Sequence, residues 1–363
     1  MSRVVLPDFP WDTIAEDVAL AKTYPGGACD LSVGTPVDPT PEIGKSAFAE
    51  AANAHGYPTV WGSHELHEAI LGYVTKRWAA PLLTDRHVAP VIGTKELVAW
   101  LPTLLGLGPQ DIVVIPEVAY PTYEVGATMT GAQIIRASSP SDVAHVCPAL
   151  IWTNTPSNPT GKVDSIEETI AWIQYARSTG ALLAADECYG EFGWDSEPVS
   201  ILDESLNGGS VEGLLGAFSL SKRSNCAGYR AGFVVGDDSV VSPLVTMRKH
   251  LGFMMPSPVQ AAMVALLGDH THVDEQRQRY LTRRTQLIDG LTQVGFTIDN
   301  SQGGLYLWAT RGESGRDTAH WLAQRGIIVA PGDFYGPAGN NHVRIALTAT
   351  DSDIAQAVSR LAR

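Results

Sequence analysis

From residue 219 to residue 230 the chain reads Ser-Leu-Ser-Lys-Arg-Ser-Asn-Cys-Ala-Gly-Tyr-Arg, directly after the strand-like run Gly213 to Ser219. Lys222 is one of only seven lysines in the chain, and it lies among hydroxyl groups with Arg230 eight positions further on. A lysine in a polar loop is most often a solvated surface residue. This pattern instead favours an amine that forms a Schiff base with an aldehyde cofactor while Ser219 and Arg230 hold the cofactor's phosphate.

Two further segments place polar side chains at the ends of apolar runs. Asn158 lies in the turn Thr-Pro-Ser-Asn-Pro-Thr-Gly (155–161), which follows such a run and projects a donor and an acceptor. A second run, from Ala181, ends in Asp186 and is followed by Tyr189. Ligands of open α/β sheets bind at the carboxyl ends of the strands. We therefore expect these side chains to meet the lysine there, whereas a helix cap or a surface acid would explain Asp186 alone.

Helical and strand-like patterns alternate from Lys45 to about His250. A capping box, Ser165 with Glu168, marks the start of one helix. The patterns predict helices over 63–78, 94–105 and 165–177, and strands over 111–116, 132–137, 149–152, 181–186 and 213–219. Alternation of this kind predicts an α/β fold with a mostly parallel, doubly wound sheet.

After Pro256 the sequence patterns change and predict long helices and short strands. The patterns predict helices over 259–267, 273–294, 316–324 and 352–361, and strands over 305–309 and 343–347. This mixture predicts a smaller α+β domain. We expect residues 1–41 to join that small domain, residues 42–255 to form the large cofactor-binding domain, and residues 256–363 to form the small C-terminal domain.

Composition excludes several classes of function. The net charge of −14 and the absence of a basic run argue against nucleic acid as a partner. The apolar stretches are far shorter than a membrane span, and the N-terminus shows no secretory signal, so we expect no membrane partner and a cytoplasmic location. The four widely spaced cysteines (Cys29, Cys147, Cys188, Cys226) argue against a metal site or a disulfide framework. We interpret Cys188, two positions after Asp186, as a small residue that fills space and not as a nucleophile.

The motifs extend over nearly the whole chain. They comprise residues 30–36, 57–66, 93–96 and 116–123, the segments of Asn158, Asp186 and Lys222, and residues 303–306 and 342–346. Together they resemble the class I/II pyridoxal-phosphate-dependent aminotransferases of fold type I, whose large domain carries a mostly parallel doubly wound sheet beside a smaller α+β domain. At finer grain, residues 6–12, 30–38 and 101–126 look like the actinobacterial succinyldiaminopimelate aminotransferases.

The resemblance implies a role for each residue around pyridoxal phosphate. Asp186 would pair with the ring nitrogen, which keeps the cofactor an effective electron sink. Tyr189 and Asn158 would hydrogen-bond the ring oxygen and so lower the pKa of the Schiff base. Tyr120 would stack on the ring, although a core tyrosine is a close rival interpretation.

The phosphate would lie where a helix begins at Thr94 and Lys95, because backbone N–H groups and the helix dipole favour an anion there. Lys95 would contribute mainly its backbone, and the alternative interpretation of its side chain is a solvated lysine without a role. Ser219 and Arg230 would complete this phosphate site. The resemblance also implies that Tyr57 crosses from the neighbouring subunit to the phosphate, so the active site would require a homodimer.

Arg344 matches the family's arginine for the substrate α-carboxylate, which a guanidinium binds with two parallel hydrogen bonds. An edge-strand arginine reaching towards water is the alternative interpretation. The backbone of Gly34 would approach the same carboxylate, and Asn158 would also contact the substrate.

We therefore expect Lys222 to hold the cofactor and then to act as the general acid–base in a ping-pong transamination. The resemblance implies that the substrates are N-succinyl-LL-2,6-diaminopimelate and 2-oxoglutarate, in lysine and diaminopimelate biosynthesis, with an undiscovered arginine or lysine near the mouth of the cleft. Alternatives are an aromatic, alanine or broad-specificity aminotransferase, or a C–S lyase, which share these cofactor residues. A cofactor-binding regulator would need a DNA-binding segment before the match begins near Asp30.

Overall fold

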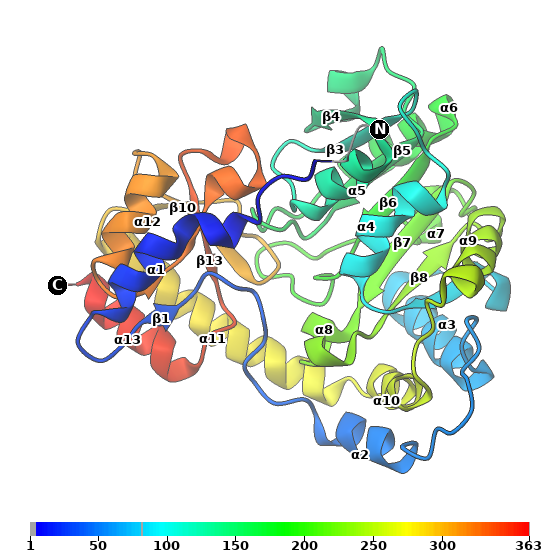
Figure 1. The fold of residues 1–363 in the computed structure, drawn as a ribbon, viewed down its shortest axis with the longest axis horizontal. Helices are drawn as coiled ribbons and strands as arrows, with labels where there is room; N and C mark the ends of the chain where they lie inside the picture. Colours follow the sequence, from blue (N-terminus) through cyan, green and yellow to red (C-terminus); the bar gives the residue numbers. More distant parts are fainter. Residues whose placement is uncertain (1–4, 81–82, 363) are drawn as a thin grey trace.

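The computed structural model describes residues 5–80 and 83–362. Figure 1 shows two α/β units side by side, with the N-terminal segment running across both of them. The large unit is built on a seven-stranded sheet, and the small unit on a four-stranded sheet and a two-stranded sheet. Within the described residues, no helix is long and apolar enough to cross a membrane.

The large sheet has the strand order β2-β8-β7-β6-β5-β3-β4. Only β8 runs antiparallel to its neighbours, so the predicted mostly parallel sheet is confirmed. The strands are β2 (Val88–Val91), β3 (Ile112–Pro116), β4 (Gln133–Ala137), β5 (Leu150–Asn154), β6 (Leu182–Asp186), β7 (Leu214–Ser219) and β8 (Gly232–Gly236). Every residue of β5, β6 and β7 is buried, which explains their continuous apolar runs.

Helices cover both faces of this sheet. Successive residues of a strand point to opposite faces, so Ile151 and Leu183 join one core while Leu150 and Leu182 join the other. The first core is covered by α3 (His64–Trp78), α6 (Ile166–Thr179) and α10 (Ser257–Gly268), and the second by α4 (Thr94–Leu104), α5 (Thr122–Thr130) and α9 (Asp238–Leu251). The sheet is therefore doubly wound.

The small unit has the antiparallel strand order β12-β13-β10-β9. Its elements are β9 (Thr297–Asp299), β10 (Tyr306–Thr310), β11 (Ile327–Ile328), β12 (Ala330–Pro331), β13 (Val343–Ala346), α11 (Thr271–Gln293), α12 (Gly315–Ala323) and α13 (Asp351–Leu361). The N-terminal segment packs here, because α1 (Ala15–Lys22) contacts α12 and β1 (Cys29–Asp30) pairs in parallel with β11. The short helices α2 (Glu42–Glu50), α7 (Glu204–Asn207) and α8 (Leu220–Arg223) belong to the large unit.

The predicted helices and strands agree with the structure to within two residues at each end, and the capping box at Ser165 is present. One helix packs where the sequence did not place it. The predicted small domain begins at residue 256, but α10 packs against α2 and α3 in the core of the large unit. This packing favours a division near Asp269, after α10. Residues 1–4, 81–82 and 363 of the predicted domains lie outside the described residues.

Candidate active site

A cavity of about 430 Å³ lies at the carboxyl ends of β5, β6 and β7, where the small unit faces the large sheet. The cavity brings together eleven of the twelve residues that the sequence analysis named. These are Gly34, Thr94, Lys95, Tyr120, Asn158, Asp186, Tyr189, Ser219, Lys222, Arg230 and Arg344. The predicted meeting of strand ends at one site is therefore observed.

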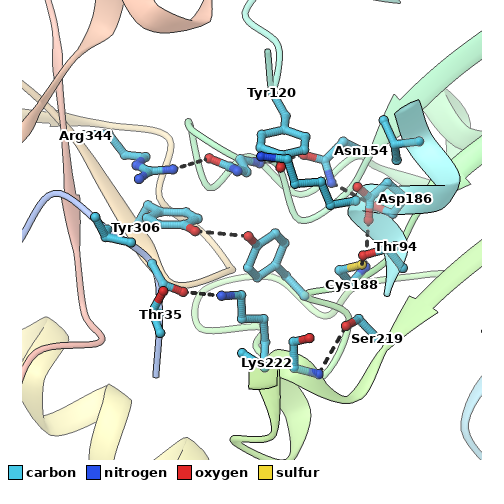
Figure 2. Close-up of a pocket in the computed structure, with 18 of the residues that line it drawn as sticks. Thr35, Thr94, Tyr120, Asn154, Asp186, Cys188, Ser219, Lys222, Tyr306 and Arg344 are labelled. Atoms are coloured by element: carbon cyan, nitrogen blue, oxygen red, sulfur yellow. Dashed lines mark hydrogen bonds between the residues drawn. The ribbon is translucent and has the colours of Figure 1, made fainter. Parts of the chain in front are cut away.

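Lys222 lies on α8, the short helix that follows β7, and its side chain points across the cavity (Figure 2). Ser219 caps this helix, since its Oγ accepts a hydrogen bond from Ser221 N at 3.1 Å. The amine donates to the backbone carbonyl of Gly34 on the opposite wall. Burial lowers the pKa of Lys222; the phenol of Tyr306 opposes this effect and the charge of Arg344 reinforces it. The amine is therefore suited to be a nucleophile and a proton carrier.

Asp186 ends β6 and is buried, with Tyr123 Oη donating to its Oδ2 at 2.8 Å and Cys188 N donating to its Oδ1 at 3.2 Å. Burial raises the pKa of Asp186, and the two hydrogen-bond donors oppose this effect. Among the described residues no cationic side chain forms an ion pair with it. A bound cation would stabilise this carboxylate.

A second part of the cavity favours an anion. Thr94 begins α4, and the first amides of a helix have no intrahelical acceptor. Gly93 precedes them at φ 91°, and a Cβ there would lie 2.0 Å from Arg230 Nη2, so only glycine allows the guanidinium this close to the helix start. Ser219 lines the same cavity.

Arg344 lies on β13 and is buried. Its Nη1 donates to Asn158 Oδ1 at 2.8 Å and its Nη2 donates to Ser32 O at 2.6 Å. The guanidinium stacks over the ring of Tyr306 at 4.1 Å from the centroid. The interpretation of Arg344 as an edge residue reaching towards water is therefore wrong, because the side chain turns into the cavity. Since Asn158 uses its carbonyl oxygen here, its NH₂ group is the one available to a ring oxygen.

Tyr57 is the one predicted site residue that does not line the cavity. Its side chain is 94% exposed. Its reach into a neighbouring subunit stays a prediction.

Several cavity residues had no role in the sequence analysis. These are Phe9, Trp11, Asn154, Ser221 and Tyr306, with Tyr123 beneath Asp186. Asn154 ends the apolar run of β5, so the argument from strand ends would have found it. Its Oδ1 accepts from Asn158 N at 2.6 Å and its Nδ2 donates to Asp186 O at 2.8 Å, which fixes the turn to the next strand. Phe9 and Trp11 carried no such signal, because their place depends on the N-terminal segment packing over the site.

Cys188 lines the cavity and donates from Sγ to Thr94 Oγ1 at 3.2 Å. Burial raises the pKa of this thiol well above its ordinary value, and the negative charge of Asp186 acts in the same direction. The neutral thiol fits the interpretation of Cys188 as a filler. Among the residues the structure describes, no group of three His, Cys, Asp or Glu side chains is arranged to hold a metal ion.

The residues present fit pyridoxal phosphate. The uncompensated carboxylate of Asp186 suits a protonated ring nitrogen, and the space kept open by Gly93 beside Arg230 suits a phosphate. The buried amine of Lys222 lines the same cavity as both groups. One elongated ligand with a cationic end, an aldehyde and a dianionic end satisfies all three features.

Proteins of similar sequence are transaminases. The chain is 54% identical over 356 residues to a probable aminotransferase of Mycobacterium tuberculosis, covering 98% of this chain and 85% of the relative. It is 48% identical to the 4-dedimethylamino-4-oxo-anhydrotetracycline transaminase OxyQ of Streptomyces rimosus, covering 98% and 99%. An LL-diaminopimelate aminotransferase of Dehalococcoides mccartyi is 28% identical, covering 98% and 96%.

Solved structures of aminotransferases share the fold. A probable N-succinyldiaminopimelate aminotransferase of Thermus thermophilus superposes with a TM-score of 0.88 at 27% identity, covering 97% of this chain and 99% of that one. An aminotransferase of Staphylococcus aureus gives a TM-score of 0.89 at 26% identity, covering 99% and 98%. The family model for aminotransferase class I and II matches residues 27–361. The chain therefore belongs to the class I and II aminotransferases, which depend on pyridoxal phosphate.

Proposed function

We propose that this aminotransferase transfers the amino group between N-succinyl-LL-2,6-diaminopimelate and 2-oxoglutarate. One observation supports a reaction on amino acids: Arg344 and Lys222 line the same cavity. A guanidinium that binds an α-carboxylate holds the neighbouring carbon at a fixed distance from the amine. The likeness to diaminopimelate aminotransferases supports the substrate class.

Each of the chain's own residues has a distinct task in this proposal. The cofactor, when bound, supplies the electron sink that makes a proton on the substrate carbon acidic. Lys222 Nζ would take that proton from the carbon of the amino donor in one half-reaction and deliver a proton to the carbon of the acceptor in the other, since burial lowers the pKa of this amine. Asp186 keeps a negative charge at the buried end of the site, and Arg344 with the backbone of Gly34 orients the substrate carboxylate.

The distal carboxylates of this substrate need a further cation. Among the residues that the structure describes, four cationic side chains line the cavity, namely Lys95, Lys222, Arg230 and Arg344. The last three of these four have tasks already, so Lys95 is the one left among them. Its side chain is exposed and its Nζ lies 5.8 Å from the ring centroid of Phe9. Its neighbour Glu96 turns away and binds Arg248 through both carboxylate oxygens.

A coupled assay tests this assignment. Purified holoenzyme should convert N-succinyl-LL-diaminopimelate with 2-oxoglutarate to glutamate faster than it converts LL-diaminopimelate, alanine or aromatic donors. Lys95→Met should raise KM for the succinylated substrate about 10-fold or more, as loss of one charge-assisted contact predicts. Lys76→Met, which removes another exposed lysine outside the cavity, should leave this KM unchanged. Faster turnover of alanine or an aromatic donor, or elimination of sulfur from a thioether amino acid, would exclude the assignment while keeping the cofactor chemistry.

A second candidate function is amination of a ketone on a carbocyclic framework. It is favoured by the 48% identity to OxyQ and by the aromatic wall formed by Phe9, Trp11 and Tyr120. Glutamate-dependent amination of 4-dedimethylamino-4-oxo-anhydrotetracycline would establish it. In that case Lys95→Met should leave the KM for the ketone unchanged, because this substrate offers no distal carboxylate.

We also propose that the active enzyme is a cytoplasmic homodimer with shared sites. The exposed Tyr57 would reach the phosphate of the partner subunit. Tyr57→Phe and Lys222→Ala should each have low activity alone. Mixing the two proteins should then restore partial activity, because one of the two sites in a mixed dimer receives both native residues. No recovery after subunit exchange would contradict sharing.

A further inference from the structure

We propose that Tyr306 is a positioning residue that links Arg344 to Tyr189, and that through Tyr189 it sets the proton affinity of the Lys222 nitrogen in the loaded enzyme. The inference rests on the roles proposed above for Tyr189 and Lys222. It adds a connection between the carboxylate-binding arginine and the residues around the cofactor ring.

Tyr306 lies between Arg344 and Lys222 (Figure 2). Its hydroxyl lies 3.0 Å from the hydroxyl of Tyr189, and both side chains are buried. Its ring lies 4.1 Å beneath the guanidinium of Arg344. A Cβ on Gly34 would lie 2.0 Å from the Tyr306 hydroxyl, so the phenol packs directly against the backbone whose carbonyl accepts from Lys222.

The direction of the phenol pair follows from the task of Tyr189. The family resemblance implies that the hydroxyl of Tyr189 donates to the cofactor's ring oxygen, and a hydroxyl has only one proton to donate. The oxygen of Tyr189 then accepts, so Tyr306 must be the donor of the 3.0 Å contact. Hydrogen bonds in such a chain strengthen one another. Donation by Tyr306 therefore strengthens the bond from Tyr189, which stabilises negative charge on the ring oxygen and lowers the proton affinity of the nearby nitrogen.

The charge of Arg344 strengthens this chain of hydrogen bonds. A cation over an aromatic face withdraws electron density electrostatically and makes the phenol a better donor. A substrate carboxylate on Arg344 neutralises that charge, so the donation weakens and the proton affinity at Lys222 rises. Binding of a carboxylate in the small unit is thereby communicated to the proton carrier of the large unit.

The groups that face Lys222 come from several elements. They are Tyr306 on β10, Arg344 on β13, Cys188 in the turn after β6, and Arg230 after the short helix Ala227–Tyr229. Arg230 and Arg344 both lower the pKa of the amine, whereas Tyr306 and Cys188 raise it in the structure without cofactor. Only Tyr306 among them contacts both Arg344 and Tyr189. Its hydroxyl is therefore the group to remove.

The test is a pH titration of the visible absorbance of the holoenzyme, which reports protonation of the Lys222 nitrogen without turnover. Tyr306→Phe keeps the ring and removes the hydroxyl, and its titration midpoint should rise by about 0.5 to 1 pH unit, the size expected for one hydrogen bond. Tyr335→Phe is the matched control. Its hydroxyl is also buried and its ring lies 5.1 Å from Arg344, but the hydroxyl has no hydrogen-bond partner among the described residues. The midpoint of the control should stay at the parental value.

A second measurement tests the coupling to Arg344. Glutarate, which carries no amine and no ketone, should raise the midpoint of the parental enzyme when it is added at saturation. The rise should be smaller in Tyr306→Phe, because only the direct effect of the carboxylate charge remains. An equal rise in both proteins would refute the link to Arg344.

The direction in which the titration midpoint of Tyr306→Phe shifts shows which of the two phenols donates the hydrogen bond. A fall of the midpoint in Tyr306→Phe means that Tyr189 donates to Tyr306 in the parental enzyme, and an unchanged midpoint means that the pair does not influence Lys222; either result overturns the proposal. Failure of the proposed function looks different. In that case no visible band depends on Lys222, or the band behaves as predicted while N-succinyl-LL-diaminopimelate is not turned over.

Discussion

The two walls of the site are built differently. The wall from the large unit places Asp186 and Lys222 on neighbouring parallel strands or directly after them, with Asn154 paired in register with Asp186. The wall from the small unit places Gly34, Tyr306 and Arg344 on segments that reach the site from the N-terminal segment and from an antiparallel sheet. Arg344 spans the two walls through Asn158, 186 positions away in sequence.

This difference separates two kinds of function. The large-unit wall is one continuous scaffold of buried strands, and it carries the groups proposed to hold the cofactor and move the proton. The small-unit wall carries the groups proposed to bind the α-carboxylate of the substrate. Substitutions in the first wall should therefore reduce the rate with all substrates, whereas those in the second should alter binding.

The largest expected effect is at Lys222. Lys222→Ala should leave the fold intact and lower the rate by at least ~10³, because it removes a covalent general acid–base. Borohydride treatment of the parental holoenzyme should fix the cofactor on the peptide that contains Lys222. Lys249→Ala, on the exposed face of α9, serves as the control. Labelling of any other lysine contradicts the assignment.

Asp186→Asn tests the buried end of the same wall. The amide keeps the shape of the carboxylate but removes the charge that stabilises the ring nitrogen, so kcat should fall by about 10² to 10³ with every substrate. Asp289→Asn, which neutralises an exposed acid on α11, should keep parental kcat. Near-normal turnover of Asp186→Asn would mean that another residue pairs with the ring nitrogen.

Arg344→Lys tests the small-unit wall. Lysine cannot reproduce the two-pronged contact, so KM for glutamate and for the diaminopimelate substrate should both rise about 10- to 100-fold, with a smaller change in kcat. Arg86→Lys, in a surface ion pair, should leave both constants unchanged. If only one of the two KM values rises, Arg344 binds the distal end of that substrate, and the proposed separation of the two walls would need revision.

Glu187 follows Asp186 in the sequence but does not line the cavity. Its substitution therefore tests only the stability of the large-unit wall, and its expected effect is the smallest. Burial raises the pKa of Glu187 to about 7, although Ser200 and the amide of Ile201 stabilise the charged form. An unfolded glutamate loses its proton near its ordinary pKa of 4.5, so the folded apoprotein loses stability as the pH rises from 4.5 to about 7. Glu187→Gln should make this pH-dependent loss of unfolding free energy smaller by on the order of 1–3 kcal/mol.

Thermal unfolding of the apoproteins at pH 5 and pH 8 measures this effect. The gap between the two melting temperatures should be narrower for Glu187→Gln than for the parental protein, while Glu204→Gln, an exposed acid, should keep the parental gap. An equal gap in all three proteins would show that Glu187 is ionised in the fold at both pH values.

Much of the large-unit wall could be predicted from local patterns. The apolar run that ends at Asp186 predicted a buried strand, and the rule that ligands bind at strand ends brought Asp186, Asn158 and Lys222 together. The same rule explains why β8 was not singled out: Gly232 to Gly236 carries no polar residue at its end and follows the loop that holds Arg230. The partners of helix α10 could not be predicted, because its apolar pattern shows that it is buried but not that it packs against α2 and α3.

The amino-acid sequence by itself determined the alternation of strands and helices, the doubly wound sheet and the residues at its strand ends, because these follow from patterns a few residues long. Only the tertiary structure decided which distant segments face those residues. Phe9, Trp11 and Tyr306 enter the site because the N-terminal segment and β10 pack there, and Arg344 turns inward because Asn158 and Ser32 accept its hydrogen bonds across the two units. Such contacts join residues hundreds of positions apart, and no local pattern encodes the direction in which a buried side chain finds its partner.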